Sequence, residues 1–422
     1  MLRALSLVAL AALGCGTKRR QGRTNDGGAF QSIGAPVFGG GAAAGGADEI
    51  EPNDDVDVAT RLVLGGTVHA RIDPESDVDF FRIDVASDGA LAVEVSAVDD
   101  ADLSLELRDA SGTLLARSDR GAAHTKEGVP NLGVTAGRYV AIVRGKRTGG
   151  KSKAAAPTLP LGYEITAHIA QPAEAAPNTE REPDDDRGTA NDLIIGDSAV
   201  GYIGWSGDAD VWKLSVEALS ANNAIDVEIA AVEGIAFTLE VSDGLGRPLV
   251  VRKAPRGAGL VLRGLVPSVP PRASPYHYLT LRATPSNPET AYSLRVSAKN
   301  PDPDSEIEPN DTPETAMPIA SDRAVVTGHW SPGDVDCYAI AADPRPRTLD
   351  VVIATPREAD FAAELVVDGK VIGKSDVKGK GAVEKLTGPV PANGRAVVRI
   401  LGSDNGSEGR YTITLGEGPR ER

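Results

Sequence analysis

The acidic segment Glu49-Ile50-Glu51-Pro52-Asn53-Asp54 reveals the architecture of the chain, because it recurs. Its later copies are Glu180-Arg181-Glu182-Pro183-Asp184-Asp185 and Glu306-Ile307-Glu308-Pro309-Asn310-Asp311. After each copy, an Asp-x-Asp motif leads into an aromatic strand: Asp77-Val78-Asp79, Asp208-Ala209-Asp210 and Asp334-Val335-Asp336. The glutamate before the proline and the second of these aspartates are always 28 residues apart. Two motifs at one spacing, three times over, predict three tandem copies of one domain.

The apolar residues inside each copy alternate with polar ones, which is typical of a strand with one buried face. In the first copy, Phe81, Ile83 and Val85 share a face, and similar runs follow at 91–95 and 103–107. Each copy closes with a strand that begins with tyrosine: Tyr163, Tyr292 and Tyr411. Without a long helical pattern, this predicts an all-β protein of three tandem antiparallel β-sandwiches, jelly-roll-like, with about eight strands each.

The repeat also sets the expected domain boundaries. A chain of 422 residues accommodates about three domains of ordinary size. The predicted sandwiches span 48–171, 178–300 and 304–417. The aligned aromatic residues Phe81, Trp212 and Tyr338 are predicted to be buried in the three cores rather than to form a ligand platform.

The N-terminus has the pattern of an export signal. The apolar run Leu5–Leu13 is too short to span a bilayer, which predicts a signal peptide at 1–14. Gly14 before Cys15 resembles a bacterial lipobox, although Ala12 stands where the lipobox prefers leucine. The resemblance implies that Cys15 becomes the lipidated first residue of the mature chain. An ordinary signal peptide with an incidental cysteine is the alternative.

Residues 15–47 are expected to form the lipidated cysteine and a flexible tether, because glycine and alanine predominate and large apolar groups are few. Several acyl chains on Cys15 would anchor the protein stably to a membrane. Gly16 and Thr17 follow, without the aspartate that favours retention in the inner membrane. We therefore expect an outer membrane lipoprotein that faces the periplasm or the cell surface.

Charge and cysteine content exclude several classes of function. A net charge of −16 argues against nucleic acid and against an anionic membrane surface as partners. Besides Cys15 the chain has only Cys337, so a disulfide framework is excluded. Cys337 is predicted to be a small buried side chain in a strand, with an intermolecular disulfide as the alternative.

The motifs of common enzymes are absent from the sequence or wrongly placed. Gly145–Ser152 fits the phosphate-binding pattern G-x-x-x-x-G-K-S, but Pro157 follows where a helix would have to begin. We interpret this segment as a hairpin loop before the closing strand. Neither H-E-x-x-H nor G-x-S-x-G occurs. The prediction is therefore no catalytic residue, with an unrecognised enzyme as the alternative.

The acidic opening, the Asp-x-Asp strand and the tyrosine-led closing strand together resemble the bacterial pre-peptidase C-terminal (PPC) domain family, which is related to the collagen-binding modules of collagenases. The resemblance covers nearly all of 48–417 as three copies. The second copy diverges, with Asp184 in place of asparagine and Arg181 between its glutamates. It implies non-catalytic β-sandwiches of the kind attached to exported proteins.

The acidic segments suggest a cation site. In an extended segment Glu49, Glu51 and Asn53 point the same way, and Asp77 and Asp79 also share a face. If the two segments meet, their charges repel, and a hard cation such as Ca²⁺, with about six to eight oxygen ligands, would resolve the conflict. Solvated linker acids are the alternative.

The family resemblance implies calcium ligands at matching positions in each copy. The first copy supplies Glu49, Glu51, Asn53, Asp54, Asp77 and Asp79. The second copy supplies Glu180, Glu182, Asp184, Asp185, Asp208 and Asp210. The third copy supplies Glu306, Glu308, Asn310, Asp311, Asp334 and Asp336.

Together these features predict a non-catalytic binding or scaffolding lipoprotein of the cell envelope, stabilised by calcium. Its expected partners are the membrane, through Cys15, and a protein or glycan ligand that the sequence does not identify. An adhesin-like module for protein fibres or polysaccharide is the alternative. Aromatic residues make up only 4% of the chain, which leaves few rings for sugar stacking.

Overall fold

The computed structural model describes residues 44–74, 76–99, 101–121, 123–147, 161–170, 178–219, 223–267, 274–319, 325–402 and 408–417. These residues form 28 strands with turns between them, and none of them is helical. No segment in these ranges is therefore a helix that could cross a membrane. The predicted signal peptide, Cys15 and the tether up to residue 43 lie outside the described residues.

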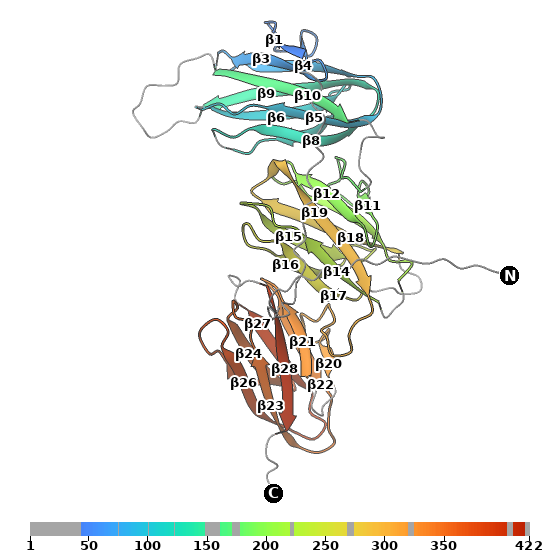
Figure 1. Ribbon diagram of the computed structural model, residues 1–422, viewed down its shortest axis with the longest axis vertical. Coiled ribbons are helices and arrows are strands. Elements are labelled where there is room, and N and C mark those ends of the chain that lie inside the picture. The colour runs from blue at the N-terminus through green and yellow to red at the C-terminus, as the bar shows by residue number, and fades with distance from the viewer. Residues whose placement is uncertain are drawn as a thin grey trace, which may run out of the picture. The chain divides into compact units, whose positions relative to one another are not determined.

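The first copy consists of two five-stranded sheets around one core (Figure 1). Its strands are β1 (Ala44–Asp48), β2 (Thr60–Arg61), β3 (Gly66–Ile72), β4 (Val78–Val85), β5 (Gly89–Val95), β6 (Ala101–Asp109), β7 (Leu114–Ser118), β8 (Glu127–Val134), β9 (Gly137–Arg147) and β10 (Leu161–Ala170). The sheet orders are β1-β3-β10-β5-β8 and β2-β4-β9-β6-β7.

The second copy repeats this topology with sheets of five and four strands. Its strands are β11 (Asn191–Leu193), β12 (Ser198–Ile203), β13 (Asp210–Ser215), β14 (Ala224–Ile229), β15 (Ala236–Ser242), β16 (Pro248–Lys253), β17 (Leu260–Leu265), β18 (Tyr276–Thr284) and β19 (Asn287–Lys299). The sheet orders are β11-β13-β18-β15-β16 and β12-β19-β14-β17.

The third copy has the same two orders, β20-β22-β27-β24-β25 and β21-β28-β23-β26. Its strands are β20 (Met317–Ile319), β21 (Val325–Trp330), β22 (Val335–Ile340), β23 (Arg347–Ala354), β24 (Phe361–Val367), β25 (Lys370–Ser375), β26 (Val383–Val390), β27 (Ala396–Gly402) and β28 (Gly409–Glu417). The predicted all-β class and the tandem antiparallel sandwiches are confirmed.

Each copy has more strands than the eight expected, because short parallel edge strands were missed. β2, β11 and β20 contain two or three residues and pair in parallel with the strand that follows the Asp-x-Asp motif. Strands this short are below the length at which alternation can be recognised. β1 is a further parallel edge strand, with Ala47 opposite Val68. The end of the expected tether is therefore part of the first sandwich, since pairing needs only backbone groups and tolerates glycine and alanine.

The aligned aromatic residues lie where the alternation predicted. Phe81, Trp212 and Tyr338 are completely buried, one in each core. Cys337, next to Tyr338, is buried and forms no disulfide with another described residue, and burial raises the pKa of its thiol to about 11.

The segment before each closing strand is not the hairpin that was predicted. β9 and β10 belong to opposite sheets, as do β18 and β19, so the chain crosses from one sheet to the other there. Residues 145–147 of the phosphate-binding pattern are the end of β9, and the rest of the pattern lies outside the described residues. The tyrosine of the closing strand thereby reaches the sheet opposite the Asp-x-Asp strand.

Candidate metal centres

The two acidic segments meet in every copy through one backbone hydrogen bond. The residue after the Asp-x-Asp motif donates its amide to the carbonyl oxygen of the Asn or Asp in the opening segment. The pairs are Phe80 N to Asn53 O (3.0 Å), Val211 N to Asp184 O (3.2 Å) and Cys337 N to Asn310 O (3.0 Å). The Glu–Pro peptide bond of the opening is cis in all three copies. This meeting brings the glutamates of the opening next to the second aspartate of the motif.

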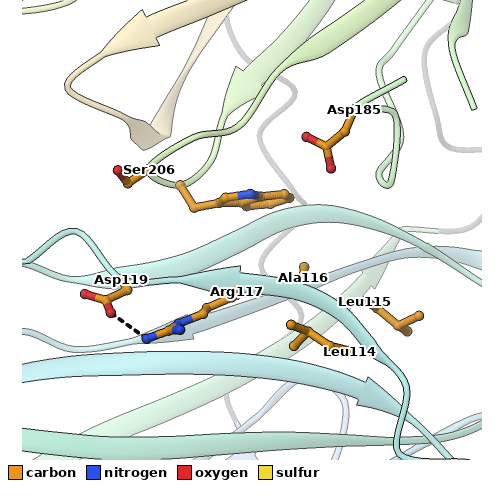
Figure 2. Close-up of a pocket in the computed structure, with 8 residues that line it drawn as sticks. Leu114, Leu115, Ala116, Arg117, Asp119, Asp185 and Ser206 are labelled. Atoms are coloured by element: carbon orange, nitrogen blue, oxygen red, sulfur yellow. Dashed lines mark hydrogen bonds and ion pairs between the residues drawn. The ribbon is translucent and has the colours of Figure 1, made fainter. Parts of the chain in front are cut away.

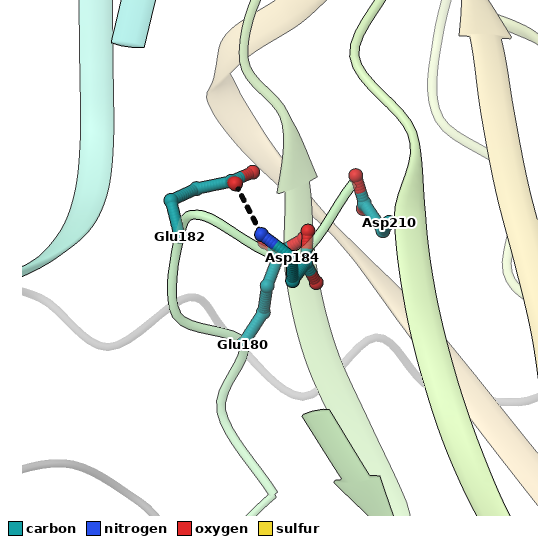
Figure 3. A group of neighbouring side chains, drawn as sticks. All are labelled: Glu180, Glu182, Asp184 and Asp210. Atoms are coloured by element: carbon teal, nitrogen blue, oxygen red, sulfur yellow. Dashed lines mark hydrogen bonds between the residues drawn. The ribbon is translucent and has the colours of Figure 1, made fainter. Parts of the chain in front are cut away.

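The second copy has the fullest carboxylate cluster (Figure 3). Glu180, Glu182, Asp184 and Asp210 are all buried, and one oxygen of each lies within 4.8 Å of the others. Among the described residues, no lysine or arginine forms an ion pair with any of the four. Four buried acids without a countercharge are unfavourable as anions, so the cluster requires protons or a cation.

Hydrogen bonds hold one oxygen of Glu180, Glu182 and Asp184 and leave the other free, and they hold neither oxygen of Asp210. Glu180 Oε2 accepts from Tyr202 N at 2.6 Å and from Asn131 Nδ2 at 2.8 Å. Asp184 Oδ2 accepts from Asn191 Nδ2 at 2.6 Å. The buried oxygens that accept no hydrogen bond are Glu180 Oε1, Glu182 Oε1, Asp184 Oδ1, Asp208 Oδ1 and both oxygens of Asp210. These unpartnered oxygens are what a bound cation would satisfy.

Burial and mutual repulsion raise the pKa of every acid in this cluster. Burial is the largest cause for Glu182, whose pKa rises to about 10, and for Asp184, whose pKa rises to about 9. The pKa of Glu180 and that of Asp210 are raised well above their ordinary values for the same reason. The folded protein therefore disfavours the ionised cluster unless a positive charge enters it.

The first copy has a smaller and more open group. Glu49, Glu51 and Asp79 bring one oxygen each within 4.8 Å of the others, but Glu51 is exposed and Glu49 is half-buried. Tyr163 donates its hydroxyl hydrogen to Asp79. Burial raises the pKa of Asp79 to about 8 and that of Glu49 to about 7.

The third copy has two overlapping groups, and a side chain from the second copy reaches one of them. The groups are Glu306, Glu308 and Asp336, and Glu308, Asp311 and Asp334. The guanidinium of Arg252 forms ion pairs with Glu308, with Asp334 at 2.7 Å and with Asp311 at 3.4 Å. Burial still dominates at Glu308 and raises its pKa to about 8 despite this arginine.

Some of the expected ligands lie beside these groups rather than in them. Asp77 and Asp208 accept backbone hydrogen bonds that close turns, from Asp73 N at 2.7 Å and from Gly204 N at 2.6 Å. Asp77 precedes β4 and Asp208 precedes β13. The alternation of side chains along a strand therefore does not point them in the same direction as the second aspartate of the motif. Asp54 and Asp185 are also outside the compact groups. Asn53 and Asn310 contact the groups of their copies by donating an amide hydrogen bond to Glu49 and to Glu306, respectively.

Several residues of these sites were not predicted as site residues. Tyr163 and Tyr411 donate hydrogen bonds to Asp79 and Asp336. The recurrence of tyrosine in each closing strand was a signal for this role. Asn131 and Arg252 come from the preceding copy, and no motif in the sequence marks either of them.

Comparisons with known proteins place the chain in no family. No protein-family model and no curated protein matches the sequence. Among solved structures, the PPC domain of a Bacillus anthracis collagenase is 18% identical, with 26% of this chain and 93% of that chain covered and a TM-score of 0.20. The tandem CBM22 domains of Paenibacillus barcinonensis Xyn10C are 12% identical, with 49% and 82% covered and a TM-score of 0.18. The PPC resemblance therefore rests on the sequence motifs.

Proposed function

We propose that this chain is an exported, non-catalytic binding or scaffolding protein of three PPC-like sandwiches, in which buried carboxylates hold divalent cations, calcium in particular. The single observation that carries the proposal is the cluster of the second copy. Its four acids converge, are buried, and keep oxygens that accept no hydrogen bond.

The ligand chemistry favours calcium. Among the described residues, the candidate groups contain only aspartate and glutamate, whereas zinc sites use histidine and cysteine. Magnesium keeps several of its waters, which a closed cluster does not accommodate. Calcium accepts about six to eight oxygen ligands in flexible geometry, and carboxylate, amide and backbone oxygens are all present.

The position of the clusters supports a scaffolding role, because the opening segments of the second and third copies are also joints between copies. Glu182 exchanges backbone hydrogen bonds with the first copy, from Gly133 N at 2.6 Å and to Asn131 O at 3.1 Å. Glu308 does the same with the second copy, from Val266 N at 2.9 Å and to Gly264 O at 3.0 Å. A cation bound by Glu182 would stiffen the first of these joints as well as the second sandwich.

Anchoring to the outer membrane through a lipidated Cys15 is part of this proposal. It is supported by the apolar run Leu5–Leu13 and by the lipobox-like residues around Cys15. The partners are then a membrane on one side and a protein or glycan ligand on the other.

A ligand-binding function has one specific observation in its favour. Tyr276 and Tyr278 lie two residues apart on β18 and therefore share a face, and Tyr276 is 37% exposed. A cation covers one face of each ring, Lys213 at 5.2 Å and Arg187 at 5.8 Å from the ring centres. Because these faces are taken, stacking on a sugar is disfavoured and scaffolding is the stronger proposal.

The direct test is thermal unfolding of the mature chain after chelator treatment, with and without added calcium. A cation that binds only the folded state must raise the unfolding midpoint in a concentration-dependent way. We expect a clear rise at millimolar calcium and a smaller one with magnesium at the same ionic strength. An unchanged midpoint at millimolar calcium would rule out the cation sites.

A further inference from the structure

The position of Arg252 is occupied by serine in the other two copies. Arg252 lies on β16 opposite Leu239, in the register in which Ser118 lies opposite Leu105 and Ser375 opposite Ala363. Both serines donate a hydrogen bond to a buried glutamate of the facing sheet. The pairs are Ser118 with Glu127 and Ser375 with Glu384, each at 2.5 Å.

The second copy has neither the serine nor the glutamate of this pair. Glu127 lies opposite Val95, and Glu384 lies opposite Ile353. The residue in the same register of the second copy is Leu260, opposite Ile229. With leucine in place of glutamate, Arg252 has no acid of its own sandwich to pair with at this position.

Arg252 is directed into the third copy instead. Its side chain is only 2% exposed, and its guanidinium contacts Glu308, Asp334 and Asp311. Glu308 and Asp334 each bring a negative charge into a buried site, whereas Asp311 is partly exposed. Arg252 therefore gives the third copy a countercharge, and among the described residues the cluster of the second copy has none.

The two joints share a backbone contact. Leu132 and Leu265, at equivalent places in β8 and β17, form the same parallel bridge to Glu182 and to Glu308. At the first joint, a cavity of about 530 Å³ is lined by residues 114–117 and Asp119 of the first copy and by Asp185, Trp205 and Ser206 (Figure 2). Arg117 in that cavity pairs with Asp119 of its own copy at 2.7 Å.

We infer that Arg252 is a built-in countercation, which takes the place of a metal ion between Glu308 and Asp334 and joins the second and third copies without metal. The oxygens of the candidate ligands support this: in the third copy, the buried ones without a hydrogen bond are Asn310 Oδ1, Asp334 Oδ2 and Asp336 Oδ1. The second copy keeps six such oxygens. The corollary, that the first joint depends on a bound cation, rests on the proposed function.

The test is to count the calcium ions bound by the mature chain and by the variant Arg252→Ser, by equilibrium dialysis with radioactive calcium. Serine is the residue of the other copies, and we expect the variant to bind one more calcium ion per chain than the unmodified protein. The matched control is Arg247→Ser, an exposed arginine of the same copy, which should leave the count unchanged. A variant that gains no calcium overturns the inference.

A reciprocal variant keeps the test decisive if Arg252→Ser does not fold. The double change Ser118→Arg and Glu127→Leu gives the first copy the residues that the second copy has at these two positions, Arg252 and Leu260. The new arginine would then face the carboxylate cluster of the second copy. We expect it to bind one calcium ion fewer than the unmodified protein, and an unchanged count overturns the inference. The proposed function is judged separately: it fails if the unmodified chain binds no calcium, whatever the difference between variants.

Discussion

Tyr163 donates its hydroxyl hydrogen to Oδ2 of Asp79, although the two residues are 84 positions apart in the sequence. Tyr411 and Asp336 form the same contact in the third copy. In the second copy, the hydroxyl of Tyr292 instead accepts from Nε1 of Trp212 at 2.9 Å. In the first and third copies, the closing strand thus supplies a hydrogen-bond donor to the buried aspartate of the opposite sheet. The second copy lacks this hydrogen bond and has the most buried carboxylate oxygens without a partner.

Replacing Tyr411 with phenylalanine should destabilise the third sandwich. The change leaves a buried oxygen of Asp336 without its donor, which costs about 1–3 kcal/mol. Urea unfolding followed by tryptophan fluorescence of Trp330, in the core of the third copy, would measure the loss. Tyr278→Phe, on the outer face of β18, is the matched control and should change stability little. Equal effects of the two variants would mean that the contact with Asp336 contributes nothing.

Replacing Asp184 with asparagine should have opposite effects with and without calcium. Asparagine is the residue of the other copies, where Asn53 and Asn310 donate to a glutamate of the opening segment. In chelator, removing an acid whose pKa is raised to about 9 should stabilise the protein by about 1–3 kcal/mol. In calcium, the loss of a charged ligand should reduce the rise in the unfolding midpoint.

Thermal unfolding in chelator and in calcium measures both effects of Asp184→Asn. The exposed acid Asp197 provides the control, as Asp197→Asn should leave both midpoints unchanged. A lower midpoint in chelator would contradict the view that repulsion dominates the empty cluster.

Glu127 should make the first sandwich less stable as pH rises. Burial raises the pKa of Glu127 from 4.5 to about 7, so folding disfavours its ionised form. The penalty is absent below about pH 4.5, grows up to about pH 7 and is complete above it, with a size of roughly 1–3 kcal/mol.

The variant Glu127→Gln tests this dependence, since it should be more stable than the unmodified protein at pH 8 but not at pH 4.5. Chemical unfolding at several pH values is the measurement, and the exposed Glu233→Gln serves as control. A stability difference that does not vary with pH would exclude titration of Glu127 as its cause.

Cys15→Ser should abolish lipid attachment if the lipobox prediction is right. In bacteria that express the full chain, labelled palmitate should be incorporated into the unmodified protein and not into the variant, which should leave the membrane fraction. Cys337→Ser controls for the loss of a thiol, because Cys337 is buried in the third sandwich. Labelling that survives in Cys15→Ser would show that the signal is of another type.

The features that depend on short-range pattern could be predicted from the amino-acid sequence. Alternation of period two identified the longer strands, and the fixed spacing of two motifs indicated three copies. The meeting of the acidic segments was a condition of the calcium hypothesis and not a prediction. The buried positions of Phe81, Trp212 and Tyr338 followed from the same alignment. These properties are local because side-chain direction along a strand repeats every two residues.

The differences between the three clusters became visible in the folded chain and not in the sequence. The second copy looked the most diverged in sequence, yet Asp184 completes its cluster of four buried acids. Arg252 reaches Glu308, 56 residues later, only because the joint places β16 beside the opening of the third copy. A charge acts on whatever the fold brings within a few ångströms of it, and a distance of that kind depends on the packing of whole sandwiches rather than on any pattern along the chain.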